Sequence, residues 1–142
     1  MEVKQIVPKQ LITKEFAKLL NENYNKTRFP LISKSIQKED ATAIWFSIAE
    51  LETYIKYIKA EARKQKYTVD GIRFHFGAYP EDKLYEEKAG LTTLFLAPTG
   101  TKKVRKTAVT AKSTLAESDD MMSISPLNYG SIGNPPPVPY EY

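Results

Sequence analysis

The only histidine of the chain, His75, lies in an alternating segment whose residue types could carry chemistry. Residues 72–79 read Ile-Arg-Phe-His-Phe-Gly-Ala-Tyr, and this alternation predicts a half-buried strand with two different faces. Arg73, His75 and Tyr79 then share one face, where a cation, an imidazole and a phenol stand together. Such a set can bind a small molecule or support hydrolysis with His75 as the base. We therefore name Arg73, His75 and Tyr79 as candidate ligand-binding residues and His75 as the candidate catalytic residue.

The sequence does not identify the carboxylate that would orient His75. A purely structural interpretation is also possible. In it, His75 is an ordinary strand residue with a satisfied hydrogen bond, and Gly77 marks a bulge or a close approach of two backbones. The spacing of the acidic residues does not decide between the two interpretations. The candidate partners are Glu50, Glu52, Asp70, Glu81 and Asp82.

A first helix is predicted before residue 30. Thr13 is a candidate N-cap, and apolar residues recur at helical spacing from Phe16 to Tyr24. The helix should end near Asn25, because poor helix formers follow and Pro30 disfavours helix in the residue before it. Its apolar stripe is expected to face the core.

A strand, a helix and a second strand are predicted over residues 43–79. Residues 43–46 are apolar and rich in strand formers, and residues 47–50 form a capping box that begins a long helix ending near Lys66. Asp-Gly at 70–71 then predicts a turn before the His75 strand. This order favours a parallel β-α-β unit with a right-handed crossover.

A further strand is predicted at residues 91–97 and should stop at Pro98. An edge strand protected by lysines is possible at 103–107. The apolar face of the His75 strand is expected to pack under the long helix through Ile72, Phe74 and Phe76.

Together these segments predict an α+β domain over residues 1–107: a small mixed sheet of three to five strands with two helices. Residues 108–142 read as an extended Ser/Pro-rich tail, flexible or docked on the domain. The adjacent acidic residues 119 and 120 are interpreted as solvated charge. The tail also holds apolar residues that could dock: Met121, Met122, Ile124, Leu127, Tyr129 and Ile132.

The long helix carries the predicted interaction surface. The chain holds nine tyrosines, and Tyr57 lies off the apolar stripe of this helix, which suits an interface. Basic residues at spacings of three and four could contact nucleic acid, or could simply form a solvated flank. They are Lys56, Lys59, Arg63 and Lys66.

Composition excludes several classes of chemistry. The chain of 142 residues has a formal charge of +4 and no cysteine, so a disulfide framework, a thiolate metal site and a cysteine nucleophile are ruled out. No phosphate loop, nucleophile elbow or paired-histidine motif occurs. We therefore expect no metal and no cofactor. Without an apolar run long enough for a signal or a membrane span, a cytoplasmic protein that does not bind membranes is expected.

Residues 44–79 together with 91–99, about half of the chain, resemble small bacterial α+β proteins with no assigned activity. These proteins pair a strand-capped helix with a strand that here holds Gly71, Ile72, Arg73, Phe74, Phe76 and Gly77. The resemblance implies no catalytic role. Three hypotheses of function follow from the residues. The first is a non-enzymatic module that binds a protein partner or associates with itself. The others are a small-molecule or hydrolytic site at the His75 face, and a nucleic-acid contact through the long helix. Whether the protein is an enzyme stays open, and a non-enzymatic role is favoured.

Overall fold

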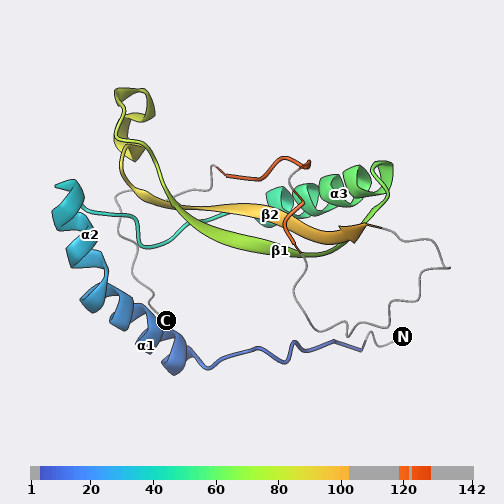
Figure 1. Ribbon diagram of the computed structural model, residues 1–142. Helices are drawn as coiled ribbons and strands as arrows, with labels where there is room; N and C mark the ends of the chain where they lie inside the picture. The colour runs from blue at the N-terminus through green and yellow to red at the C-terminus, as the bar shows by residue number, and fades with distance from the viewer. Residues whose placement is uncertain (1–3, 103–118, 122, 129–142) are drawn as a thin grey trace.

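A computed structural model describes residues 4–102, 119–121 and 123–128 (Figure 1). Its elements are three helices, a hairpin of two long antiparallel strands and a short 3-10 helix between the strands, which confirms the α+β class. Helix α3 covers one end of the hairpin, whereas α1 and α2 lie toward the other end (Figure 1). The elements are α1 (Lys14–Thr27), α2 (Phe29–Ile36), α3 (Ile48–Lys64), β1 (Tyr67–Ala78), η1 (Lys83–Lys88) and β2 (Thr92–Lys102).

The hairpin is the frame of the molecule. Strand β1 pairs with β2 from Tyr67 opposite Lys102 to Ala78 opposite Thr92, with a bulge between Val69 and Gly71. Gly100 is needed on β2, since a Cβ there would overlap the carbonyl oxygen of Thr68 on β1. The loop between the strands forms η1.

Helix α3 builds the core against the hairpin. Ser47 caps it by accepting a hydrogen bond from the backbone N–H of Glu50 at 3.0 Å, as the capping box predicts. Three residues at helical spacing, Tyr54, Ile58 and Ala62, are buried against Leu96 of β2 and the surrounding apolar side chains. The predicted core stripe of α3 is therefore confirmed for these three residues.

The segment 119–128 lies along the free edge of β2. Leu96 and Leu127 exchange both backbone hydrogen bonds at 2.8 Å, and Met121 N–H donates to the carbonyl of Pro98 at 2.9 Å. Only isolated bridges form, because the chain turns between them and tucks Met121 and Ile124 into the core. The described part of the segment is thus joined to the sheet and to the core.

The predicted parallel unit is wrong. Residues 43–46 make only an isolated bridge at Trp45 and no strand, and the sheet in the described residues has two antiparallel strands rather than a mixed set of three to five. The strand formers of 43–46 fit a strand locally, but the available edge of β2 is bridged by 119–128 instead. The possible strand at 103–107 lies outside the described residues.

Two prolines were misinterpreted as stops. Pro30 lies in the first turn of α2, where a missing N–H costs no helical hydrogen bond. The chain therefore forms α2 directly after α1, in addition to the two helices that the sequence predicts. Strand β2 runs through Pro98, which lies opposite Ile72. Leu96 directs its N–H and carbonyl to Leu127, away from β1. The direction of the backbone groups repeats every second residue of a strand, so the nitrogen of Pro98 also faces away from β1. The ladder between β1 and β2 therefore loses no hydrogen bond at Pro98.

The apolar face of β1 is only partly covered, contrary to expectation. Strand β1 begins at Tyr67 and takes Asp70 and Gly71 into its bulge instead of turning there. Ile72 packs against the core cluster, but Phe74 and Phe76 are 56% and 86% exposed. Helix α3 reaches only the end of the hairpin near the bulge, so the two phenylalanines extend beyond it.

Asp40 joins the α1–α2 unit to the sheet. Its carboxylate is fully buried and accepts from the backbone N–H of Thr92 at 2.7 Å and from the Thr92 hydroxyl at 2.5 Å. Its own N–H donates to the Ser33 hydroxyl at 3.0 Å. Burial, and secondarily the negative charge of Asp40, raise the pKa of Tyr24 on α1. This carboxylate therefore ties the end of α2 to the start of β2.

Replacing Asp40 should destabilise the fold. In Asp40→Ala the two donors of Thr92 lose a buried partner, so we expect the free energy of unfolding to fall by about 1–3 kcal/mol in urea titrations. Asp40→Asn keeps one acceptor and should lose less. Glu39→Ala, at an exposed neighbouring position, is the matched control and should be near neutral. Equal effects of Asp40→Ala and Glu39→Ala would contradict this role.

Tyr54 should make the fold sensitive to alkali. Its hydroxyl lies 2.9 Å from the carbonyl oxygen of Ser125 and 3.2 Å from that of Leu96, and burial, then the nearby Tyr57, raise its pKa above 10.0. The unfolded chain then loses this proton first, so stability is fully present below pH 10.0 and falls as pH rises further. Tyr54→Phe should cost about 1 kcal/mol at neutral pH and make the alkaline decline shallower. Tyr57→Phe removes only the lesser cause of the raised pKa, so it should make the alkaline decline shallower by less than Tyr54→Phe does.

Candidate functional site

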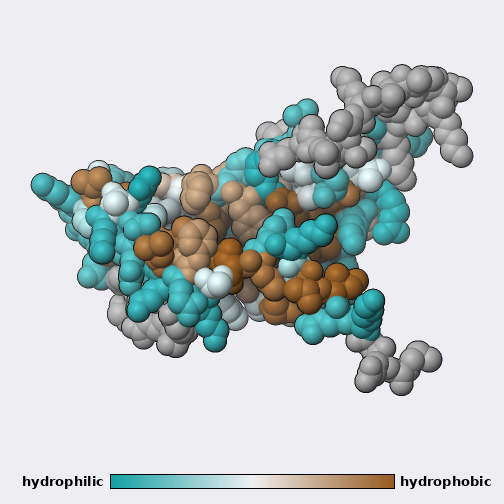
Figure 2. Space-filling view, turned by 90° about the horizontal axis from the view of Figure 1, so that it is seen from below, coloured by the Kyte–Doolittle hydropathy of each residue, from teal (hydrophilic) through white to brown (hydrophobic). Residues whose placement is uncertain are grey.

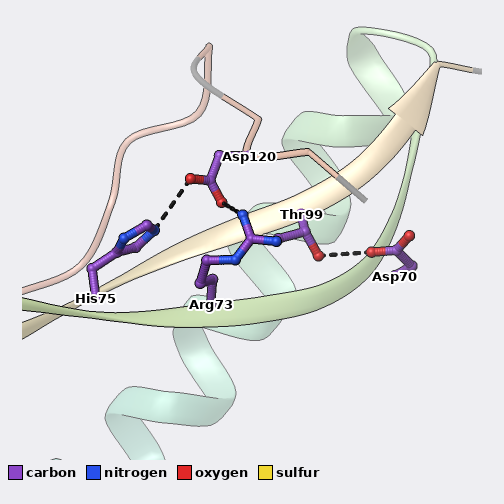
Figure 3. Close-up of polar contacts among 5 residues, drawn as sticks. All are labelled: Asp70, Arg73, His75, Thr99 and Asp120. Carbon is purple, nitrogen blue, oxygen red and sulfur yellow. Dashed lines mark hydrogen bonds and ion pairs between the residues drawn. The ribbon is translucent and has the colours of Figure 1, made fainter. Parts of the chain in front are cut away.

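Arg73 and His75 converge on one carboxylate, that of Asp120 (Figure 3). Nη1 of Arg73 lies 2.5 Å from Oδ1 of Asp120, and Nε2 of His75 lies 3.2 Å from Oδ2. The ring of His75 stacks on Phe95 of β2, with centroids 4.7 Å apart and planes 7° from parallel. Nε2 is buried and has no hydrogen-bond partner of suitable geometry among the described residues, although the Asp120 carboxylate is its close neighbour.

A second polar contact extends this cluster along the sheet. The hydroxyl of Thr99 on β2 donates to Oδ1 of Asp70 in the β1 bulge at 2.7 Å, beside the Arg73 guanidinium (Figure 3). Thr99 also forms an isolated bridge with Asp120. The bulge thus brings Asp70 to the same face as Arg73. Asp70 was one of the candidate carboxylate partners of His75, but the carboxylate beside His75 is that of Asp120.

Tyr79 belongs to a separate network on this face. Its hydroxyl donates to Oδ1 of Asn128 at 2.7 Å, and the Asn128 amide donates to the hydroxyl of Thr93 at 3.2 Å and to the carbonyl of Leu94 at 2.7 Å. The Tyr79 side chain is buried. Its phenol is therefore committed to a contact inside the chain.

The alternation of β1 places Arg73, His75 and Tyr79 on one face, but segment 119–128 supplies a partner to each of them. Asp120 reaches Arg73 and His75, and Asn128 reaches Tyr79. The sequence interpretation missed Asp120, which it assigned to solvated charge. The apolar residues around it, which predict docking of this segment, were the signal that could have found it.

The contacts of the cluster tether segment 119–128 to the sheet, because Asp120 reaches two side chains of β1. A catalytic site needs an open space beside its reactive atoms. The groove of about 540 Å³ on the other face is lined by Phe76 and Leu94 but by neither Arg73 nor His75. Among the described residues, no group of three or more potential ligands could hold a metal ion.

The predicted surface on α3 is exposed. Lys56, Lys59 and Arg63 lie on the helix in solvent-exposed positions, whereas Lys66 follows the end of the helix with a left-handed φ of 61°. Tyr57 is 43% exposed and stacks on Tyr54. The helix therefore ends two residues before Lys66, and contact of the four basic residues with nucleic acid stays a prediction.

No family model, curated protein or solved structure matches this chain. The resemblance to small bacterial proteins accordingly stays a prediction. In the part of the chain that the structure describes, none of the helices has the length and apolar character needed to cross a membrane.

Removing the Asp120 charge should loosen the tether modestly. Asp120→Asn breaks ion pairs whose side chains are a quarter to a third exposed, so we expect a loss of about 0.5–1 kcal/mol in the free energy of unfolding, less at high salt. Asp119→Asn, at the exposed adjacent position, is the matched control. Identical unfolding curves for the two variants would show that Asp120 is not a tether.

Proposed function

We propose that this chain is a non-enzymatic protein-interaction module, and that it binds its partner through an apolar face shared by α1 and β1. We define the apolar face as Phe16, Leu19, Leu20, Phe74 and Phe76. The observation that carries the proposal is the exposure of α1. Its apolar stripe was expected to form core, yet none of its residues is buried, and Phe16, Leu19 and Leu20 are each about half exposed.

The two parts of the apolar face meet at one groove. Leu20 and Tyr24 of α1 line it on one side, and Phe76 of β1 with Leu94 of β2 lines it on the other. Its volume of about 540 Å³ is in the range of ligand and peptide sites. Apolar residues gather in a band on the side of the molecule seen in Figure 2. Side chains of a partner that enter this groove would contact α1 and the hairpin together.

The energetic reason for a partner is the hydrophobic effect. Each large apolar side chain left in water forgoes about 1.5–3 kcal/mol that its full burial would supply. Exposed apolar residues are common singly, but several of them around one groove are typical of interaction surfaces. Apolar or aromatic side chains of another protein are the chemistry that fits this face.

The alternative of a small-molecule or hydrolytic site is less well supported. Asp120 pairs with the Arg73 guanidinium and contacts the His75 ring, and Asn128 accepts from the phenol of Tyr79. A substrate would have to displace these internal partners before it reached any of the three side chains. The groove, by contrast, can receive side chains of a partner without breaking a contact of the fold.

The proposal is tested by separating stability from association. Leu20→Glu should change the free energy of unfolding of the purified chain by less than about 1 kcal/mol, because Leu20 is already half exposed. A photo-crosslinking residue at position 20, in the full chain in its native cells, should form a covalent adduct with another chain. The same residue at Lys26, exposed near the end of α1, is the control and should form far less.

Either of two results would overturn the proposal. A loss of more than about 2 kcal/mol in Leu20→Glu would mean that α1 belongs to the core of the chain itself. Equal crosslinking from positions 20 and 26 would mean that the apolar face has no specific partner.

A further inference from the structure

The outer edge of β1, on the side away from β2, carries a row of backbone groups with no hydrogen-bond partner among the residues that the structure describes. Leu96 on β2 directs its N–H and carbonyl to Leu127, so the position opposite it, Phe74, is not hydrogen-bonded across the ladder. The N–H and carbonyl of Phe74 therefore point outward. The direction of the backbone groups repeats every second residue of a strand, so the N–H and carbonyl groups of Ile72, Phe76 and Ala78 also point outward.

None of the described residues forms a hydrogen bond with these outward groups. No described strand lies beside this edge in Figure 1. Edge strands are commonly protected by lysine, proline or a bulge. Residues 72–78 contain no lysine, proline or bulge, and their one permanently charged side chain, Arg73, pairs with Asp120. The edge is bounded by the bulge at Asp70 on one side and by Pro80 on the other.

We propose that this edge pairs antiparallel with the same edge of a second copy of the chain, about a two-fold axis at His75. The inference rests on the proposed function, because it names the partner that covers the β1 part of the apolar face. Its basis is self-complementarity. With His75 opposite its own copy, Ile72 faces Ala78 and Phe74 faces Phe76, so all four outward residues exchange both backbone bonds.

The neighbouring registers are worse for identifiable reasons. An axis at Phe74 sets Ala78 against Asp70 in the bulge, where the ladder is interrupted. An axis at Phe76 sets Ile72 against Pro80, which has no N–H to donate. The register at His75 alone avoids both interruptions and uses the whole edge.

The side chains fit the same register. On the exposed face, Phe74 of each copy lies opposite Phe76 of the other, which brings aromatic rings together. On the other face Arg73 lies opposite Gly77, which has no side chain to obstruct it. The two histidines meet at the axis, each beside its own Asp120. Pairing would join the two hairpins into one continuous sheet and cover the two most exposed aromatic rings of β1.

Sedimentation velocity of the full chain over the micromolar range tests the pairing. We expect a dimer, and Phe76→Pro should raise its dissociation constant by about 100-fold or more, because each copy loses an outward N–H and an aromatic ring. Proline at this position leaves the ladder with β2 intact. Phe76→Val keeps the N–H and should raise the constant by only about tenfold.

A cysteine crosslink tests the register without relying on the folding of the proline variant. The chain has no cysteine, so His75→Cys introduces one thiol per copy. Opposite residues at the axis lie close enough for a disulfide. Oxidation should give a covalent dimer much faster than in Ala78→Cys, whose thiol lies about 20 Å from its copy in this register.

A chain that stays monomeric, or equal crosslinking of the two cysteine variants, would overturn the pairing. The experiments distinguish a failure of this pairing from a failure of the proposed function. A monomer whose position 20 still crosslinks to a different protein would retain the interaction module and remove only the second copy as its partner.

Discussion

The reciprocal hydrogen bonds between Leu96 and Leu127 are the interaction on which the rest of the structure depends. A hairpin of two strands is at best marginally stable in water, because it cannot bury enough apolar surface. Leu96 is fully buried at the centre of β2, with Tyr54 of α3 beside its carbonyl and Leu127 on its outer edge. A strand, a helix and a segment distant in sequence thus meet at one residue. Without the distant segment, β2 would lose both its edge partner and the two core residues Met121 and Ile124.

The same edge contact determines the polar face of the sheet. Residues bridged across neighbouring strands point to the same side, so Leu127 follows Leu96 toward α3, and Asp120 follows Thr99 toward Arg73 and His75. The apolar and polar contacts of segment 119–128 therefore arise from one placement. Charge on this face is balanced locally by Asp120. These contacts tether the segment to the polar face of the sheet.

Local signals in the sequence predicted the local structure well. The capping box at Ser47, the buried stripe of α3 and the alternation of β1 all depend on residues a few positions apart. The pairing of the strands could not be obtained in this way, because 43–46 is rich in strand formers yet forms no strand, whereas 119–128, which lacks a strand pattern, bridges β2. The partner of His75 was missed for the same reason, since Asp120 is 45 positions away in the chain.

The prolines illustrate the limit of local rules in another way. Proline lacks an N–H, but its effect depends on whether a bond is needed at that position, and this is decided by the register. At Pro30 the first helical turn needs no such bond, and at Pro98 the N–H position faces away from β1. A sequence shows the residue type but not which side of the strand requires a donor.

The two ends of the hairpin differ in how they are held, and this difference explains where a partner would act. At the α3 end, Tyr54, Ile58 and Leu96 form a continuous core. At the other end, the hydrogen bonds that join α2 and the following segment to the hairpin region are those accepted by the buried Asp40, next to the small buried residue Ala41, and the one that Lys38 donates to the carbonyl of Glu87. A polar anchor fixes position through a few directional bonds and buries little apolar surface. The α1–α2 unit is therefore placed beside the sheet with its apolar stripe still in water. Because Leu20 and Phe76 line one groove, a chain that covers the β1 edge would also come close to that stripe.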